Sequence, residues 1–195
     1  PSRLPFDSPH YATPRGPSSS VVRKPNRLTL EGKESLESNF EQAMLARRLT
    51  SQRSTVTTRL SFEPESFQQM AGLAAYYNAY LFHYLYLSMD EDTGLCLQIH
   101  SCDDGASSFP LGSGIIPVST GELFLRATFE DKGLQFHFSE DGENFREAGP
   151  VLDASILSDD HGEHWGFTGT FVALACQDLT GSSLQANFDF LELSS

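Results

Sequence analysis

Residues 166–179 read Gly-Phe-Thr-Gly-Thr-Phe-Val-Ala-Leu-Ala-Cys-Gln-Asp-Leu, and this stretch decides the fold class. Its centre is apolar and rich in β-branched, aromatic and small residues, and its only charge is one aspartate near the end. That composition is typical of a β-strand buried on both faces. Gly166 and Gly169 stand at the start of the strand, where missing side chains let another backbone or a ligand come close. Phe167 and Phe171 beside them are either core residues or rings presented outward.

The sequence on either side of this stretch also reads as strands separated by turns. Alternation is clearest where Val56, Thr58, Leu60 and Phe62 fall on one face, which is the pattern of a half-buried strand. Further strands are expected over residues 28–30, 72–80, 81–89, 95–101, 115–118, 123–129, 134–139 and 184–193. Turns with positive φ are expected at Asp131-Lys132-Gly133 and Asp141-Gly142. Because no helix beyond a turn or two is indicated, we predict an all-β fold, an antiparallel two-sheet β-sandwich of the jelly-roll type.

Composition divides the chain into two parts. Residues 1–27 hold five prolines in the first seventeen positions and a run of three serines, which is typical of an extended linker. Residues 28–195 are expected to form a single β-sandwich domain, with regular structure beginning at about Arg27. The chain starts at Pro1 without an initiator Met or a signal segment, so we expect a piece of a longer protein. The compartment of that parent protein stays open between cytoplasmic and secreted.

Charge and hydropathy exclude two classes of partner. The formal net charge is −13, which would repel a phosphate backbone, so we expect no nucleic acid. The basic cluster of Arg47, Arg48 and Arg53 indicates a solvated strand face or a salt-bridge site for a neighbouring surface. Residues 71–89 are the most apolar stretch, but Asn78 and several tyrosines make it too polar for hydrocarbon. We therefore expect a soluble protein with no membrane partner.

Three cysteines, Cys96, Cys102 and Cys176, are an odd number without a Cys-x-x-Cys pair. They read as free, mostly buried thiols, although a bridge between Cys96 and Cys102 stays open because facing positions would allow one. His161-Gly-Glu-His164 places two histidines near a carboxylate, yet a glycine-containing loop gives the two rings no fixed common face. We therefore expect no metal and no cofactor.

The sequence offers no convincing catalytic group. A hydrolase of the α/β type would carry a Gly-x-Ser-x-Gly elbow between a strand and a helix, and this motif is absent from the sequence. Glycoside cleavage needs two carboxyl groups about 5–10 Å apart across a sugar. With 26 Asp and Glu residues scattered over turns, such a pair can always be imagined, so the pairing carries no weight without a cleft. No catalytic residue is therefore assigned.

Several motifs, taken together and in one order, resemble a known family. They are Gly32-Lys-Glu-Ser-Leu36, Met44-Leu-Ala-Arg-Arg48, Phe62-Glu-Pro-Glu-Ser-Phe-Gln-Gln-Met-Ala-Gly-Leu73, Tyr76-Tyr77-Asn78, Ser101-Cys-Asp-Asp104, Gly149-Pro-Val-Leu-Asp-Ala-Ser-Ile-Leu-Ser-Asp159, Gly166-Phe-Thr-Gly169 and Cys176-Gln-Asp-Leu179. This set is similar to the C-terminal concanavalin A-like β-sandwich of β-xylosidases in glycoside hydrolase family 43. The resemblance covers nearly the whole chain, the linker around Pro5-Phe6-Asp7 included.

The resemblance implies that two separate domains contribute to the active site in different ways. In that family a separate five-bladed β-propeller carries the three catalytic carboxylates of an inverting glycosidase, and none of them maps onto this chain. The sandwich packs on the propeller and sends an aromatic side chain to the rim of the active-site pocket, at the position of Phe167. An apolar ring suits the face of a sugar and shapes a small pocket. The implied partners are the propeller and a xylo-oligosaccharide or arabinoside at the shared pocket, while a homo-oligomer stays open.

Two functions of different classes follow. The first is a non-catalytic accessory domain of a hydrolase that trims xylan or arabinan, and the second is an autonomous lectin-like carbohydrate-binding module, because sandwiches host many functions. A binding module would expose several aromatic side chains in a row on one sheet, whereas an accessory module would bury an apolar patch against its partner domain. An enzyme with catalytic carboxylates of its own is a third, more distant alternative.

Overall fold

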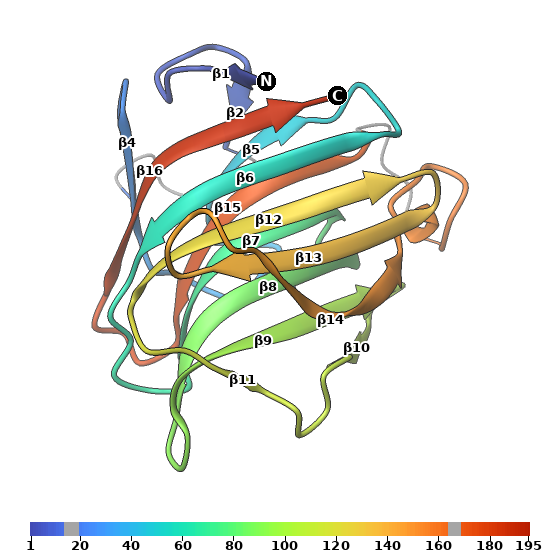
Figure 1. The fold of residues 1–195 in the computed structure, drawn as a ribbon. Helices are drawn as coiled ribbons and strands as arrows, with labels where there is room; N and C mark the ends of the chain where they lie inside the picture. The colour runs from blue at the N-terminus through green and yellow to red at the C-terminus, as the bar shows by residue number, and fades with distance from the viewer. Residues whose placement is uncertain (14–19, 164–168) are drawn as a thin grey trace.

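The computed structural model describes residues 1–13, 20–163 and 169–195, and β-strands dominate it (Figure 1). The 3-10 helix η2 accompanies the strands. In chain order the elements are β1 (Ser2–Arg3), β2 (Tyr11–Ala12), β3 (Val21–Lys24), β4 (Arg27–Glu31), β5 (Ala43–Arg48), β6 (Ser54–Ser61), β7 (Gln69–Asn78), β8 (Leu81–Asp90), β9 (Gly94–Asp103), β10 (Ala106–Ser108), β11 (Ile116–Pro117), β12 (Glu122–Glu130), β13 (Gly133–Ser139), β14 (Arg146–Asp153), η2 (Ala154–Ile156), β15 (Phe171–Asp178) and β16 (Gln185–Ser194).

The strands form two sheets that lie face to face. Sheet A has the order β14-β13-β12-β6-β16-β4-β3, and β1 also pairs with β16. Sheet B has the order β10-β9-β8-β7-β15-β5-β2, and β11 also pairs with β9. Figure 1 shows sheet A in front of sheet B, and the pairs within each sheet are antiparallel. The predicted antiparallel two-sheet β-sandwich is therefore confirmed.

Strand β15 lies in the middle of sheet B, between β7 and β5, and is buried on both faces. Val172 and Leu174 point into the core between the sheets, and both are fully buried. Ala173 and Ala175 point to the outer side of sheet B, where they join a second apolar cluster. The predicted two-sided burial is confirmed for this strand, which begins at Phe171. Small side chains on the outer side leave room for the larger aromatic residues of neighbouring strands.

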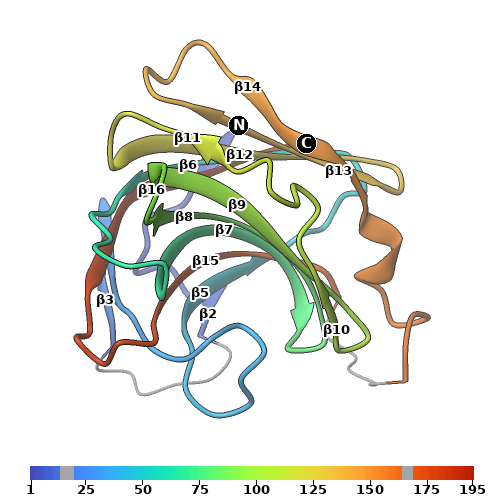
Figure 2. The same ribbon diagram turned by 90° about the horizontal axis from the view of Figure 1, so that it is seen from below.

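The outer face of sheet B is covered by the loop of residues 32–42, which hangs below the sheet in Figure 2. Leu36 from this loop is 3% exposed and packs against Tyr84 and its neighbours. The Gln42 side chain donates hydrogen bonds to the backbone oxygens of Leu36 and Ser38, at 2.7 and 2.8 Å. Residues 34–40, which the sequence left open between a loop and a helical turn, form no helix.

The strongest pattern-based expectations for sheet A are confirmed. In β6, Val56, Thr58 and Leu60 are fully buried, while the alternate positions are more exposed. Asp141-Gly142 lies in the connection between β13 and β14, and Asp131 in the turn between β12 and β13 has a φ of +53°. Alternation fixes the face of each strand because a shift of one residue would turn every apolar side chain toward water.

Residues 1–27 contain more regular structure than we expected from their prolines. Strands β1, β2 and β3 precede Arg27: β3 and β2 lie at the ends of the strand orders of sheets A and B, and β1 pairs with β16. Phe6 and Tyr11 are 1% and 5% exposed and belong to the main core. The division at residue 27 stays a prediction, but burial of these two rings ties the described part of this segment to the sandwich.

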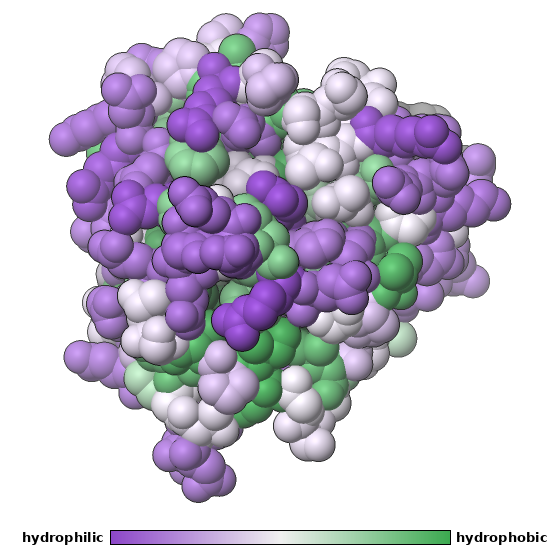
Figure 3. Space-filling model, viewed as in Figure 1, coloured by the Kyte–Doolittle hydropathy of each residue, from purple (hydrophilic) through white to green (hydrophobic). Residues whose placement is uncertain are grey.

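The surface over sheet A is mostly hydrophilic, with hydrophobic residues gathered over the lower part of the view, near β11 (Figure 3). Ile116 in β11 and Leu111 before it are partly buried and pack against the main core. All three cysteines are free and buried, as expected, so the bridge that was left open between Cys96 and Cys102 is not formed. The described residues include no helix long and apolar enough to cross a membrane.

Candidate functional site

Phe167, the one binding residue that the sequence predicts, lies outside the described residues, together with Gly166. The structure describes the chain up to Glu163 on one side and from Gly169 on the other. Residues 153–163, called the leading limb below, run from the end of β14 through η2 toward this position. Contacts of the leading limb and of Gly169 therefore define the surroundings of the predicted site.

A buried histidine on β8 contacts the first residue of the leading limb. His83 on β8 is 4% exposed, and its Nε2 lies 2.9 Å from the Asp153 backbone oxygen, while its Nδ1 lies 2.7 Å from Ser101 Oγ. Nε2–H donates to the carbonyl, so Nδ1 accepts from the serine hydroxyl in the neutral ring. Burial lowers the pKa of His83, and the bond to Asp153 opposes this only in part. The neutral ring thus fixes the backbone where the leading limb starts.

Asp153 also caps η2. Its carboxylate accepts hydrogen bonds from the Ser155 N–H at 2.9 Å and from the Ser155 hydroxyl at 2.5 Å. These two bonds lower the pKa of Asp153. A second backbone bond, from Ala154 N–H to the Lys132 oxygen at 2.8 Å, holds the same turn to the β12–β13 connection. A short helix whose first N–H groups are satisfied in this way has a fixed start.

Tyr77 on β7 holds the middle of the leading limb. Its ring is 4% exposed within the core between the sheets, and its hydroxyl donates to Asp159 Oδ1 at 2.5 Å. Asp159 is an exposed residue of the limb. A hydrogen bond to a carboxylate is shorter and stronger than one between neutral groups. One end of the bond is anchored in the core, so the loop is tied to a rigid element.

The end of the leading limb is fastened to the connection after β9. His161 Nε2 lies 2.7 Å from Asp103 Oδ1, and the Glu163 N–H donates to Asp104 Oδ1 at 3.1 Å. Gly162 between them has a φ of +77°, and a Cβ there would come within 2.8 Å of that Asp104 oxygen. A residue with a side chain would be strained here and would collide with the carboxylate.

Gly169 and Thr170, the first described residues after 164–168, also make contacts that hold the chain. Gly169 has a φ of +75°, and a Cβ there would come within 2.9 Å of the Arg48 guanidinium, which agrees with the predicted need for a small residue. The Thr170 hydroxyl donates to the Leu157 backbone oxygen at 2.7 Å, and the Leu49 N–H donates to the Thr170 oxygen at 2.9 Å. The bond between Thr170 and Leu157 joins the two sides of the loop.

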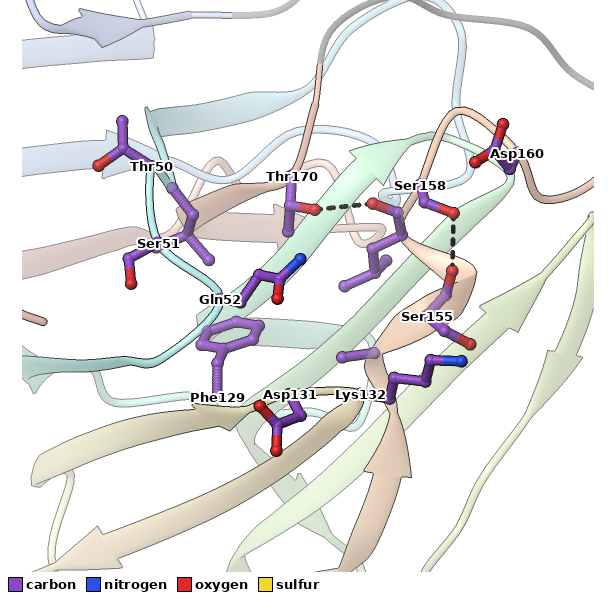
Figure 4. Close-up of a pocket in the computed structure, with 13 residues that line it drawn as sticks. Thr50, Ser51, Gln52, Phe129, Asp131, Lys132, Ser155, Ser158, Asp160 and Thr170 are labelled. Carbon is purple, nitrogen blue, oxygen red and sulfur yellow. Dashed lines mark hydrogen bonds between the residues drawn. The ribbon is translucent and has the colours of Figure 1, made fainter.

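A polar cleft of about 580 Å³ opens beside the leading limb, at the same end of the sandwich (Figure 4). In Figure 4 the residues of the β5–β6 connection lie on one side of the cleft and those of the limb on the other, with the Phe129 ring near its base. Its polar lining comes from Thr50, Ser51, Gln52, Asp131, Lys132, Ser155, Ser158, Asp160 and Thr170. Within the described residues, the side chains of Thr50, Gln52, Lys132 and Asp160 have no hydrogen-bond partner of their own.

Comparison with known proteins identifies the family to which this fold belongs. A family model described as the β-xylosidase C-terminal concanavalin A-like domain matches residues 3–194. The chain belongs to this family. The resemblance inferred from the sequence motifs is therefore confirmed, and the concanavalin A-like form of the sandwich with it.

Individual relatives of this β-xylosidase C-terminal domain carry consistent names. The chain is 40% identical over 176 residues to a xylosidase/arabinosidase 43B of Humicola insolens, covering 87% of this chain and 33% of that protein. It is 38% identical over 173 residues to a β-xylosidase of Bacillus subtilis, covering 88% and 32%. A crystal structure of a xylan β-1,4-xylosidase from Bacillus halodurans matches with a TM-score of 0.91 at 34% identity, covering 100% of this chain and 39% of that one. The chain thus spans about a third of the length of its curated relatives.

The family domain presents no metal cluster in its described part. No group of three or more His, Cys, Asp or Glu side chains lies close enough to hold an ion there. His161 of the predicted His161-Gly-Glu-His164 motif pairs with Asp103, and His164 lies outside the described residues. Within the described residues the motif thus supplies one side-chain contact, at 2.7 Å, between an imidazole and a neighbouring carboxylate.

The three arginines of the basic cluster, Arg47, Arg48 and Arg53, have different neighbours in the structure. Arg47 donates to the Ser2 backbone oxygen and hydroxyl, and Arg53 pairs with Asp131 at 3.4 Å at an exposed site. Arg48 is exposed beside Gly169. Two of the three arginines therefore hold elements of this chain, and the third lies next to the segment that contains Phe167.

A row of exposed aromatic side chains, the feature expected of a lectin-like module, is missing from the described part of sheet B. Its outer face is rich in aromatic residues, but Phe82, Tyr84 and Tyr86 are 0%, 1% and 6% exposed beneath neighbouring elements. The exposed phenylalanines elsewhere, Phe40 and Phe67 among them, lie on separate loops. This face is packed in a way that leaves no platform for a sugar ring.

Sequence reasoning did not identify Tyr77, Asp103 and Asp159 as residues that fasten the leading limb, although each of the three lies in a motif that carried the family resemblance. Tyr77 belongs to Tyr76-Tyr77-Asn78, Asp103 to Ser101-Cys-Asp-Asp104, and Asp159 ends its own motif. In the structure the three motifs meet at the leading limb. Their joint occurrence in one family was the available signal, but only the fold shows that they touch.

Proposed function

We propose that this chain is the non-catalytic accessory domain of a glycoside hydrolase that removes xylose or arabinose units from hemicellulose fragments. Two observations support this. The family match covers residues 3–194, and the curated relatives, named as xylosidases or as a xylosidase/arabinosidase, are about three times as long as the matched part. The remaining two thirds of such a protein has room for a catalytic domain of its own.

The accessory domain packs against that catalytic domain, a β-propeller by the family resemblance, through the end of the sandwich that carries the cleft and the leading limb. The contacts on both sides of residues 164–168 support this choice of surface. Glu163 is held by Asp104 and Thr170 is bonded to Leu157, so both ends of the segment are fixed at one end of the fold. The unpaired polar groups of the adjacent cleft suit a partner that is itself protein.

Phe167 closes one side of the sugar pocket in this arrangement. In the sequence Phe167 falls between two held positions, Gly162 and Gly169, whose positive φ values favour glycine. An apolar ring at a pocket rim excludes water and covers one face of a pentose ring. The substrate is accordingly a short xyloside or arabinoside at the pocket that the two domains share.

The test is Phe167→Ala in the full-length protein that carries this domain, with Phe67→Ala as the matched control. Phe67 is 60% exposed and lies just before the first residue of β7, whereas Tyr77 lies near the last residue of that strand. Phe167→Ala should weaken kcat/KM on short xylosides and leave Tm close to that of the wild type, whereas the control should change neither. A core phenylalanine would instead cost about 3–5 kcal/mol of stability. A large fall in Tm with unchanged kinetics would refute the proposed role.

A further inference from the structure

A second cleft, of about 420 Å³, lies between the start of the chain and β16, and it is called the entry cleft below. Its walls come from residues 3–6, from the turn between β3 and β4, and from the middle of β16. Figure 1 shows β1 next to β16 at the top of the view. Within the described residues, no side chain lines both this cleft and the polar cleft beside the leading limb. The volume is within the range of about 300–1,000 Å³ that is typical of small-molecule sites.

A β-bulge in β16 aims two neighbouring side chains at the entry cleft. The pairing of β16 with β6 shifts its register between Phe188 and Leu191. Asp189 and Phe190, the two residues in between, are both partly exposed and both line the cleft. The buried Thr58 hydroxyl donates to the Phe190 backbone oxygen at 2.6 Å and holds the bulge from β6. Bulges re-aim side chains next to functional sites, and this one places an apolar ring beside a carboxylate.

The opposite wall of the entry cleft is held by contacts within the chain. The Phe6 ring is 1% exposed in the main core, and the Phe6 N–H donates to the Pro25 backbone oxygen at 3.1 Å. Arg23 on β3 donates to the backbone oxygens of Phe6 and Ser8, each at 2.5 Å. Both walls are therefore formed before any ligand arrives, which removes an ordering cost that binding would otherwise carry.

The charged groups at the entry cleft already have partners of opposite sign. Arg3 Nε donates to Glu192 Oε2 at 2.6 Å, and Arg3 Cζ lies 3.9 Å from the centre of the Phe190 ring. Asp189 Oδ2 accepts from Arg59 Nη1 at 2.9 Å. Because these charges cancel in pairs, the cleft favours a neutral ligand over an anion or a cation.

Three polar groups at the entry cleft remain free to recognise such a ligand. In the described part of the chain, the terminal nitrogens of Arg3, the Asn26 amide and Asp189 Oδ1 have no hydrogen-bond partner. They offer donors, an amide that both donates and accepts, and an acceptor. Phe190 and Pro25 add apolar surface between them. A sugar ring combines the matching features, an apolar C–H face and hydroxyl groups that donate and accept.

We propose that the entry cleft is a binding site for a neutral oligosaccharide. Asn26 and Asp189 bind hydroxyl groups of the sugar, and Phe190 contacts its C–H face. A second contact with a glycan chain raises the effective concentration of that chain at the protein. The choice of a xylan fragment as the first probe rests on the proposed function, whereas recognition of a neutral sugar rests on the cleft itself.

The experiment follows the backbone amide NMR shifts of the 195-residue chain during a titration with xylohexaose. The amides of Arg3, Asn26 and Phe190 should shift and reach saturation. Asn26→Ala should raise Kd about threefold to tenfold, the range expected for one lost hydrogen bond. Asn26 is an exposed turn residue, so its removal leaves the fold intact. Gln52→Ala, in the polar cleft beside the leading limb, is the matched control and should leave Kd unchanged.

Phe190→Ala tests the apolar wall separately. It should raise Kd about tenfold or more, because it removes the largest apolar surface that the bulge presents. Phe190 also contacts Arg3, so the spectrum of this variant must first match the wild-type fold away from the cleft. If it does not, the result for Asn26→Ala decides.

Maltohexaose, a neutral oligosaccharide unrelated to xylan, is the second probe. Saturable shifts at the entry cleft with xylohexaose support the site and its link to xylan, whereas saturation with maltohexaose alone supports a sugar site but contradicts that link. No saturation with either probe up to about 10 mM, a very weak affinity, would overturn the inference. A Kd that Gln52→Ala raises and Asn26→Ala leaves unchanged would overturn it as well. None of these readouts depends on hydrolysis, so the accessory role is tested independently.

Discussion

The Asp178 carboxylate accepts a hydrogen bond from the Leu184 backbone N–H at 2.8 Å, and this contact ties the end of β15 to the start of β16. The same carboxylate accepts bonds from the N–H and hydroxyl of Thr180, the hydroxyl of Ser182 and the side-chain amide of Gln69, at 2.6–3.3 Å. Asp178 is 6% exposed. A buried charge is tolerated here because five donors from four residues bond to it.

Asp178→Asn should lower the stability of the sandwich by about 2–3 kcal/mol, because the amide nitrogen cannot accept the bonds that one carboxylate oxygen receives. For a chain of this size that corresponds to a fall in Tm of about 5–10 °C. Thermal unfolding at pH 7 measures it, and Asp92→Asn, in the exposed turn between β8 and β9, is the matched control. A Tm for Asp178→Asn equal to that of the control would contradict this account of the site.

Acid unfolding should also distinguish Asp178→Asn from Asp92→Asn. Burial by itself would raise the pKa of Asp178, but the bonds from Leu184, Thr180 and Ser182 outweigh it and hold the pKa well below the ordinary value of 3.8. The unfolded chain therefore takes up this proton first, so the stabilisation is present above about pH 4 and is lost as the pH falls below it. Asp178→Asn should flatten the loss of stability between about pH 4.5 and 2.5, whereas Asp92→Asn should follow the wild type.

The lowered pKa of His83 predicts a second pH range, higher than that of Asp178, in which the stability of the fold changes. Burial lowers its pKa below the ordinary 6.5, so protons bind the unfolded chain more readily and stability falls as the pH drops below about 6.5. One such group contributes at most about 1.4 kcal/mol per pH unit. His83→Gln offers a donor to the Asp153 oxygen and an acceptor to Ser101 without a titrating ring. Urea unfolding of this variant should show a flatter slope from pH 6.5 to 5, and an unchanged slope would place the titration elsewhere.

The sandwich could be predicted from local pattern because strand burial leaves a direct signature in the sequence. The apolar run that begins at Phe171 forms the doubly buried β15, and alternation around Leu60 gave the correct buried face of β6. The order of the strands in each sheet leaves no such signature. In the same way, prolines predicted a linker over residues 1–27, while burial of Phe6 and Tyr11 depends on contacts with distant strands.

The candidate site could be predicted only in part, for a related reason. The sequence indicated Phe167 and the need for a small residue at Gly169, and the structure supports the second through its positive φ and the nearby Arg48. The bond between Tyr77 and Asp159 joins residues 82 positions apart. Neither side chain has an unusual local context, so only the fold brings the pair together. Long-range polar contacts of this kind are set by topology, not by spacing.

The 195-residue chain alone should not hydrolyse aryl xylosides or arabinosides. The catalytic carboxylates that the family resemblance implies belong to the propeller, and no catalytic residue is assigned in this chain. A chromogenic assay with the purified chain, beside the full-length protein as a positive control, measures this. Turnover that is abolished by changing one of the chain's own Asp or Glu residues would overturn the accessory role and favour an enzyme in its own right.

The docking surface is testable with single cysteines at opposite ends of the sandwich. Gln52 lines the cleft beside the leading limb, and Asp92 lies in the β8–β9 turn at the far end of the strands; both are exposed in this chain. The native thiols interfere little because they are buried, and burial raises the pKa of Cys102 to about 11, which slows its reaction.

In the full-length protein, Gln52→Cys should react with a soluble thiol reagent about tenfold or more slowly than Asp92→Cys, because a covered thiol cannot be approached by the reagent. Peptide mapping by mass spectrometry assigns the label to each position. Rapid labelling at Gln52→Cys would mean that the cleft faces water and that the domains meet at another surface. Slow labelling at Asp92→Cys with rapid labelling at Gln52→Cys would place the partner at the opposite end, where it could not receive Phe167. The proposed arrangement therefore requires protection at the cleft and exposure at the turn in the same molecule.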